Sequence, residues 1–215
     1  MALHQLLLFV VAGLLLNLTP GPDVLYIVSH ALRSGVRAGI VAACGIGAGC
    51  FVHIFAASVG VSAVLAASAT AFAALKGIGA AYLVWIGIRM LRSRAAPMDG
   101  LIAGGPGRAS PSLRTVFVRG FSTNALNPKV ALFFLAFVPQ FIGPVVEHKA
   151  LAFLLLGLLF NLNGLAVNTG WAIAAAWLAS NVGAVRKCMH WLERAAGVMF
   201  VGFGLKLALS DNPSR

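Results

Sequence analysis

Two charged residues of opposite sign adjoin apolar stretches of the sequence and are the first candidates for chemistry. Asp23 follows residues 1–22, which contain no Asp, Glu, Lys or Arg, and Lys129 precedes residues 130–146, which contain none either. A charge at the centre of a lipid bilayer costs about 2.5–3.5 kcal/mol on insertion scales, so it normally has a partner or a function. We expect both residues to face one central site, where they either pair or hold the ammonium and the carboxylate of a zwitterion.

Each charge belongs to a proline-containing run that should break its helix. The runs are residues 17–23, NLTPGPD, and residues 124–129, NALNPK. Proline removes a backbone donor and collides with the preceding turn. In a membrane, the freed amides and carbonyls must be buried in protein or line a polar cavity. A helix that restarts after the break directs its N-terminal amides, with their partial positive charge, into that cavity.

A purely structural interpretation of the two charges stays open. Asp23 would cap a helix after Pro22, and Lys129 would extend its ammonium to the membrane surface. The occurrence of opposite charges in two matching breaks favours the functional interpretation.

Other polar residues in apolar stretches are weaker candidates for the lining of a pathway. They are Asn17, His53, Asn161, Asn163 and Asn168. A histidine can relay a proton, although a buried ring that bonds a backbone carbonyl explains His53 more simply. Amides in membrane helices also bond between helices, at about 0.6–2 kcal/mol each.

Metal, redox and nucleotide chemistry find little support in the sequence. If Cys44 and Cys50 lie on one helix, they point about 120° apart and lie about 9 Å apart along its axis, too far for a disulfide. The scarce carboxylates offer no cage for a hard cation, and no P-loop motif is present. We therefore expect no metal, no cofactor and no enzyme activity.

The elements that must position these residues are membrane helices. The chain has 215 residues, of which 60% are hydrophobic and 10% charged, against about half and a quarter in ordinary globular domains. A bilayer-spanning helix needs roughly 20 apolar residues. We expect an all-α membrane domain over residues 1–215 with six spans. Their approximate bounds are 4–31, 37–62, 69–91, 115–142, 150–178 and 187–209. The first span should be a retained helix rather than a signal peptide, because no Lys or Arg precedes it.

The positive charge of the chain indicates how it lies in the membrane. The formal net charge is +11, and most of the basic residues fall near residues 29–38, 89–119 and 179–194. Cytoplasmic loops of membrane proteins carry an excess of Lys and Arg. We therefore expect these three segments in the cytoplasm and both termini outside, and no nucleic-acid partner.

An internal repeat accounts for the paired breaks. Residues 93–113 are rich in Pro, Gly and Ser and should form a cytoplasmic linker between two halves, about 1–92 and 114–215. With three spans each, the halves would have opposite orientations, as in inverted-repeat transporters. Residues 75–93 align with residues 192–210. Identical pairs in that alignment are Leu75 and Leu192, Val84 and Val201, Gly87 and Gly204, and Ser93 and Ser210; near the breaks, Pro22 and Asp23 align with Pro128 and Lys129.

At these motifs the sequence resembles the LysE/RhtB family of bacterial amino-acid exporters. The resemblance rests on residues 17–49 and 123–142 and extends over essentially the whole chain. It implies six helices, an inner-membrane location and export driven by the proton-motive force. It places the two family signatures on Thr19, Pro20, Gly21, Pro22, Asp23, Asn124, Asn127, Pro128 and Lys129. It does not assign an obligatory proton to Asp23, because members can carry Asn there.

Together, these observations predict a proton-coupled exporter of neutral amino acids, such as homoserine, threonine or the branched-chain residues. It would work by alternating access in the lipid bilayer, and a homo-oligomer is left open. A dibasic substrate would need a second membrane anion besides Asp23. The alternatives are an exporter of metal cations, a cysteine-based redox carrier and a packing subunit of a larger assembly.

Overall fold

The computed structural model describes residues 3–67, 69–92, 111–142, 146–177 and 182–209, and these residues form helices and no strand. The all-α prediction is confirmed for this part of the chain. Most of the predicted linker, residues 93–110, lies outside the described residues. The elements are α1 (Leu3–Leu18), α2 (Pro22–Ala67), α3 (Ala69–Arg92), α5 (Leu113–Ala125), α6 (Pro128–Leu132), the π-helix η1 (Phe133–Phe137), the 3-10 helix η2 (Val138–Phe141), α7 (Lys149–Trp177) and α8 (Val182–Leu209).

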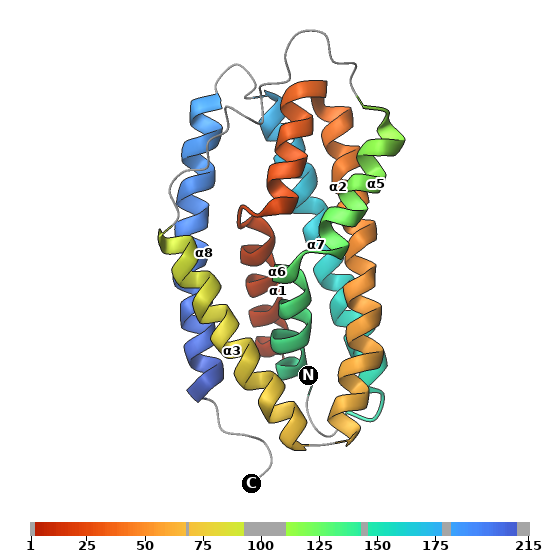
Figure 1. Cartoon of the computed structure of the whole chain (residues 1–215), viewed down its shortest axis with the longest axis vertical. Coiled ribbons are helices and arrows are strands. Elements are labelled where there is room, and N and C mark those ends of the chain that lie inside the picture. Colours follow the sequence, from red (N-terminus) through yellow and green to blue (C-terminus); the bar gives the residue numbers. More distant parts are fainter. Residues whose placement is uncertain (1–2, 68, 93–110, 143–145, 178–181, 210–215) are drawn as a thin grey trace.

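A reversal of the chain lies inside α2, at Gly35. This residue has φ 79° and ψ 178°, a backbone conformation that is open essentially to glycine alone. In Figure 1 the chain rises through the first part of α2 and returns through the second part. The predicted spans 4–31 and 37–62 therefore correspond to α1 with the first part of α2, and to the second part of α2.

The predicted break in the fourth span also appears. Over the predicted span 115–142 the chain forms α5, α6, η1 and η2 in succession, and the segments Leu113–Ala125 and Pro128–Phe141 meet at an angle of 44°. The other predicted spans match α3 and α7 closely, whereas α8 begins five residues before the predicted residue 187, at Val182.

The helices pack in two groups around α1. α2 packs along α5 and α7, α1 packs along α7, and α3 packs along α8. Figure 1 shows α3 and α8 on one side of α1, with α2, α5 and α7 on the other. α3 and α8 approach so closely that a Cβ atom added to Gly87 would lie 2.7 Å from the carbonyl oxygen of Gly197. Small residues at such crossings are typical of helix packing in membranes.

The buried apolar side chains form two separate clusters. One is largely aromatic and contains Phe9, Phe133, Phe134, Phe137, Phe153 and Phe160. The other gathers around the first part of α2 and contains Val24, Ile27, Val28, Ile46, Val116 and Trp171. Each cluster collects residues from several helices, so together they hold the bundle closed above and below its middle.

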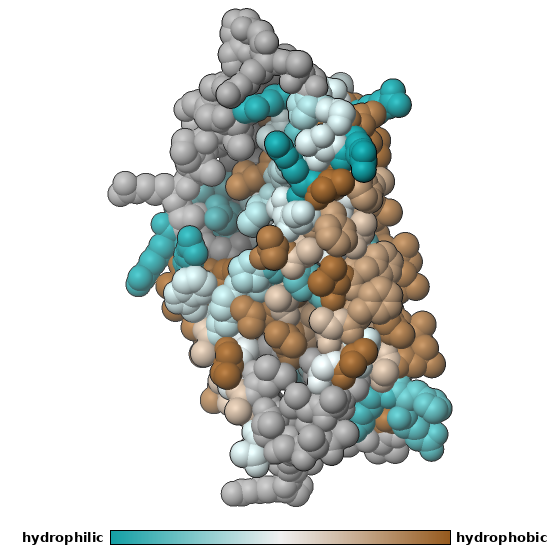
Figure 2. All heavy atoms as spheres, turned by 45° about the vertical axis from the view of Figure 1, so that its right-hand side comes forward, coloured by the Kyte–Doolittle hydropathy of each residue, from teal (hydrophilic) through white to brown (hydrophobic). Residues whose placement is uncertain are grey.

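The outside of the molecule is apolar over much of its height. Exposed large hydrophobic residues include Leu151, Leu155 and Leu162 of α7 and Phe55 and Val59 of α2. Figure 2 shows a hydrophobic surface along the right-hand side of the view, between hydrophilic residues at its upper and lower ends. By length and composition, Pro22–Gly60 and Lys149–Trp177 qualify as membrane spans, and the bent pair around α5 and α6 as a third. These features identify a membrane protein.

Candidate functional site

The first break separates α1 from α2 at residues 19–21. Thr19 completes the last turn of α1, because its backbone N–H and its hydroxyl both donate to the carbonyl oxygen of Leu15, at 3.1 and 2.6 Å. Pro22 is the first residue of α2, where the missing N–H of proline costs nothing. Asp23 follows in the first turn, where the positive end of the helix dipole favours an anion.

The second break separates α5 from α6 at residues 126–127. Asn127 caps α6, since its Oδ1 accepts a hydrogen bond from the backbone N–H of Lys129 at 3.0 Å. Pro128 takes the first helical position, as Pro22 does in α2. The two breaks therefore use the same local chemistry, proline followed by a charged residue in the first turn.

The tertiary structure brings the two breaks together through Asp23. Its Oδ2 accepts hydrogen bonds from Nδ2 of Asn124 and from Nδ2 of Asn127, both at 2.9 Å. All three side chains are buried. The two amides come from the end of α5 and the cap of α6, so the anion of the first break holds both sides of the second.

Lys129 makes the reverse connection. Its Nζ donates to the carbonyl oxygens of Leu16 and Thr19, each at 3.2 Å. These carbonyls lie at the C-terminal end of α1, where a cation is favoured by the helix dipole. In this geometry each charge bonds the opposite break.

His53 of α2 forms a hydrogen bond with the backbone of the second break. Its Nε2 donates to the backbone carbonyl of Asn124 at 2.8 Å, and the ring is buried. A carbonyl can only accept, so Nε2 carries the proton in this arrangement. His53 thus bonds a backbone carbonyl, as the simpler of its two predicted roles requires, and it holds the residue that bonds Asp23.

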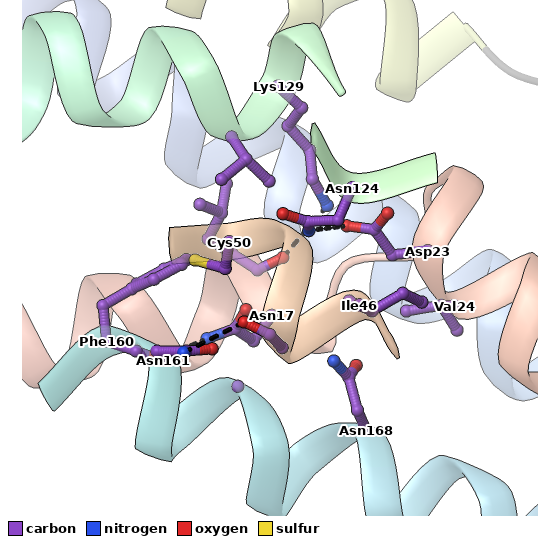
Figure 3. Close-up of a pocket in the computed structure, with 14 residues that line it drawn as sticks. Asn17, Asp23, Val24, Ile46, Cys50, Asn124, Lys129, Phe160, Asn161 and Asn168 are labelled. Atoms are coloured by element: carbon purple, nitrogen blue, oxygen red, sulfur yellow. Dashed lines mark hydrogen bonds between the residues drawn. The ribbon is translucent and has the colours of Figure 1, made fainter. Parts of the chain in front are cut away.

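A small cavity lies between the two breaks and α7. Its volume is about 20 Å³, room for about one water molecule. Its apolar walls come from both buried clusters, with Leu16 and Phe160 from the aromatic one and Val24 and Ile46 from the other. Figure 3 shows Asp23, Asn124 and Lys129 converging on one side of it. The full lining is Leu16, Asn17, Asp23, Val24, Ile46, Gly47, Cys50, Asn124, Lys129, Val130, Phe160, Asn161, Gly164 and Asn168.

The predicted pathway residues divide into those at the cavity and those away from it. Asn17, Asn161 and Asn168 line it, and Figure 3 shows Asn168 pointing toward it from α7. Asn161 donates from Nδ2 to the carbonyl of Gly47 at 3.1 Å, so it also links α7 to α2. Asn163 is not among the lining residues, and its Nδ2 is buried without a hydrogen-bond partner in the described part of the chain.

Several lining residues carry no signal for a site in the sequence. Gly47 and Gly164 look like packing glycines, yet Gly47 supplies a carbonyl to Asn161 and Gly164 makes room for the amide of Asn17. Cys50 resembles any small buried residue of an apolar helix. Only the polar neighbours at helical spacing, Asn161, Gly164 and Asn168, indicate in retrospect that one face of α7 lines a cavity.

The described residues contain no group of three or more His, Cys, Asp or Glu that could hold a metal ion. Cys50 is buried and Cys44 exposed, and both are free thiols. The side chain of Cys188 lies outside the described ones. The groups present at the cavity are therefore one carboxylate, one ammonium, one thiol, several amides and apolar walls.

Comparisons with known proteins agree with this membrane architecture. A family model described as LysE type translocator matches residues 14–211. An uncharacterized membrane protein of Vibrio cholerae serotype O1 is 32% identical over 208 residues, which cover 97% of this chain and 98% of the relative. A leucine efflux protein of Enterobacter sp. is 30% identical over 200 residues, or 93% of each chain. A leucine efflux protein of Salmonella typhimurium is 26% identical over 204 residues, or 93% and 92%. No solved structure gives a significant match.

Proposed function

This chain belongs to the LysE type translocator family, and from that premise we propose that it exports neutral amino acids, leucine among them, in exchange for protons. The observation that carries the proposal is the buried cavity where Asp23 and Lys129 from two broken helices meet apolar walls. A zwitterion with an aliphatic side chain matches this combination of groups. The leucine efflux proteins among its relatives support the same substrate class.

The charges of the cavity favour a neutral amino acid over a dibasic one. Asp23 is the one acidic residue among those that line it, and Lys129 the one basic residue. A second side-chain ammonium would therefore have no carboxylate, and an unpaired charge in a membrane interior is costly. An aliphatic side chain instead gains contact with Leu16, Val24 and Phe160.

Export requires the cavity to widen and to open to each side in turn. A cavity of about 20 Å³ holds a water molecule and not an amino acid. The two apolar clusters supply the walls of the cavity. We therefore assign this conformation to a closed state, in which the aromatic cluster and the second cluster, which contains Trp171, are the two barriers. The helix breaks on either side of the cavity are the places where the chain can bend with little loss of hydrogen bonds.

The alternating motion would take place between two inverted halves, of three spans each, related by pseudo-symmetry. Aligning residues 75–93 with residues 192–210 pairs Gly87 with Gly204, Ala80 with Gly197 and Val84 with Val201. A Cβ added at Gly87 would contact Gly197 O and Val201. A Cβ added at Gly204 would contact Ala80 O and Val84. Exchanging the halves converts one set of contacts into the other, so this crossing of α3 and α8 supports the repeat.

The crossing of α2 and α7 supports the same relationship. An added Cβ at Gly39 would meet Ala172, and one at Gly157 would meet Ile54. The register that places Gly39 over Gly157 also places Ile54 over Ala172, so these contacts too exchange with one another. Two helix pairs with matching contacts favour a pseudo-two-fold axis through the bundle, and with it six passes through the bacterial inner membrane.

The orientation follows from the basic residues. Arg33 and Arg37 flank the reversal at Gly35, and Arg114 follows the first residue of α5. In Figure 1 this reversal and the start of α5 lie near one end of the bundle, and α1 begins and α8 ends near the other. We place the Arg-rich end in the cytoplasm and both termini outside. Amino acid then leaves the cytoplasm through the barrier near Trp171 and exits through the aromatic cluster.

The test is amino-acid efflux from cells that lack their own exporters and are loaded with dipeptides containing leucine, threonine or homoserine. We expect the wild-type chain to speed efflux of at least one of these, and a protonophore to stop it. Asp23→Asn and Lys129→Gln should each slow efflux by at least about tenfold, because truncating one partner of a buried charged contact is costly.

Exposed residues of the same charge provide the controls. Glu147→Gln and Lys187→Gln change side chains that lie at the surface, and both should export at the wild-type rate. Unimpaired export by Asp23→Asn and Lys129→Gln at wild-type protein levels would contradict the proposed site. Efflux of none of the three amino acids would contradict the substrate class.

A further inference from the structure

The carboxylate of Asp23 uses its two oxygens unequally. Oδ2 accepts two amide N–H groups, from Asn124 and Asn127, both at 2.9 Å. Oδ1 is buried and has no hydrogen-bond partner among the described residues. Buried carboxylate oxygens in folded proteins are normally satisfied, so an open one at a cavity indicates a group that binds there.

A second open acceptor belongs to Asn124. Because its Nδ2 donates to Asp23, its Oδ1 faces elsewhere, and this atom is likewise buried without a partner in the described part of the chain. Asn127 cannot help, since its Oδ1 already accepts from the backbone N–H of Lys129. Both residues with an open acceptor line the cavity. An open acceptor on an anion fits a donor that is itself a cation.

Two of the three titratable neighbours of Asp23 donate hydrogen bonds to other groups. The titratable groups that face Asp23 in the described structure are Lys129 from α6 and His53 and Cys50 from α2. Lys129 donates two of its N–H groups to carbonyls of α1, and His53 donates its Nε2–H to the carbonyl of Asn124. Cys50 carries only a thiol, a weak donor.

We propose that Asp23 Oδ1 is a single binding site that takes either a proton or the primary ammonium of the substrate, and never both. The inference rests on the proposed amino-acid export and specifies how that export is coupled. When neither ligand is bound, the site holds the one water molecule for which the cavity has room.

Proton and substrate replace one another at Asp23 in two steps. Substrate from the cytoplasm displaces the proton: the O–H bond of the Asp23 carboxylic acid breaks, the proton passes to water, and the ammonium forms hydrogen bonds to the carboxylate. On the outer side the amino acid leaves with its ammonium intact, and a proton from water bonds to Oδ1. One proton enters for each zwitterion that leaves, so every cycle moves one positive charge inward.

This binding site also defines the chemical class of the ligand. A primary ammonium has N–H donors for Asp23 Oδ1, whereas a quaternary ammonium has none. The carboxylate of the substrate is not required for proton release. Leucinamide, which has the ammonium without the carboxylate, should therefore displace the proton, and 4-methylpentanoate, which has the carboxylate without the ammonium, should not.

The experiment measures proton release from the purified full-length chain in weakly buffered detergent solution at pH 6, with a soluble pH indicator. Leucine, threonine and homoserine are each added, followed by leucinamide and 4-methylpentanoate in parallel samples. We expect release of up to one proton per chain on addition of an exported amino acid or leucinamide, and none with 4-methylpentanoate. The apparent Kd for leucine should rise as the pH falls, approaching about tenfold per pH unit once Asp23 is mostly protonated.

The outcomes separate this inference from the proposed function. Binding of an amino acid without proton release, or equal release by leucine and 4-methylpentanoate, would overturn the inference that proton and ammonium share one binding site. Either result would leave amino-acid export standing. Binding of none of the three amino acids overturns both. Asp23→Asn should bind leucine with no dependence on pH, while Glu147→Gln should behave as wild type; if Asp23→Asn does not fold, the two analogues decide the question in the wild-type chain.

Discussion

Lys129 donates from Nζ to the carbonyl oxygen of Thr19 at 3.2 Å, so the cation of the second helix break completes the end of the first. Asp23 of the first break returns the interaction by accepting from the amide of Asn127, the cap of α6. Neither break is satisfied by its own half of the chain alone. The stability of each therefore depends on the position of the other, and a movement between the halves must exchange these bonds for others.

Removing the ammonium of Lys129 should loosen this connection. In Lys129→Gln the carbonyls of Leu16 and Thr19 lose a charged donor, and we expect about 1–3 kcal/mol of destabilisation, because hydrogen bonds to charged groups are the stronger ones. Thermal unfolding in detergent measures the effect. Lys187→Gln, at an exposed side chain of α8, is the matched control and should unfold as the wild type does. Equal unfolding temperatures for all three proteins would show that the contacts carry no stability.

His53 offers a test of positioning against proton relay. Its Nε2–H holds the carbonyl of Asn124, and the amide of a glutamine can make the same kind of bond without carrying a proton. We expect His53→Gln to keep most of the proton-driven efflux and His53→Leu to reduce it, since leucine removes one hydrogen bond to that carbonyl, at about 0.5–1.5 kcal/mol, and leaves it the backbone N–H of Asn127 at 2.8 Å. Efflux rates at matched protein levels provide the measurement. If His53→Gln folds normally but no longer couples efflux to the proton gradient, the ring itself carries the proton.

The crossing of α3 and α8 should respond equally to substitution on either helix. A Cβ at Gly87 would come within 2.7 Å of Gly197 O, and one at Gly204 within 2.9 Å of Ala80 O. Gly87→Ala and Gly204→Ala should each destabilise the protein by about 1–3 kcal/mol through overpacking. Gly77 and Gly202 have open space at the corresponding atom, so Gly77→Ala and Gly202→Ala are controls on the same two helices and should be neutral or slightly stabilising.

Thermal unfolding of these four variants also tests the repeat. Similar losses in Gly87→Ala and Gly204→Ala are the expected result of contacts that exchange under pseudo-symmetry. A large loss in one of them alone would mean that the two ends of the crossing are packed differently.

Gly35 isolates a backbone effect from a packing effect. Apart from the adjoining backbone, no atom of the described residues lies within 4 Å of a Cβ added there, but φ is +79°. Gly35→Ala should therefore destabilise the protein by about 1–3 kcal/mol through backbone strain alone. Gly60 has the same open surroundings and no positive φ, so Gly60→Ala is the control. Unchanged unfolding of Gly35→Ala would mean that the reversal inside α2 can be made by another backbone conformation.

Much of the helical plan is visible in the sequence because it depends on local properties. Apolar stretches of membrane length predict the helices, and proline next to Asn and Thr predicts the breaks, since proline cannot continue a hydrogen-bonded helix. The pairing of Pro22 and Asp23 with Pro128 and Lys129 is likewise a local pattern. The turn at Gly35 was expected between two spans, although the positive φ that explains the glycine appears only in the structure.

The partners of the two charges could not be obtained in this way. Nothing in the sequence says that Asp23 bonds Asn124 and Asn127, that Lys129 bonds Leu16 and Thr19, or that Gly47 and Gly164 complete the wall of a cavity. These contacts join segments about a hundred residues apart, and they depend on how the helices cross. Sequence alone determined that this chain has two broken helices with opposite charges; the tertiary structure decided that each charge bonds the opposite break and that Asp23 Oδ1 is left open. The physical reason is that a helix break is a local event, whereas the satisfaction of a buried charge depends on every helix packed around it.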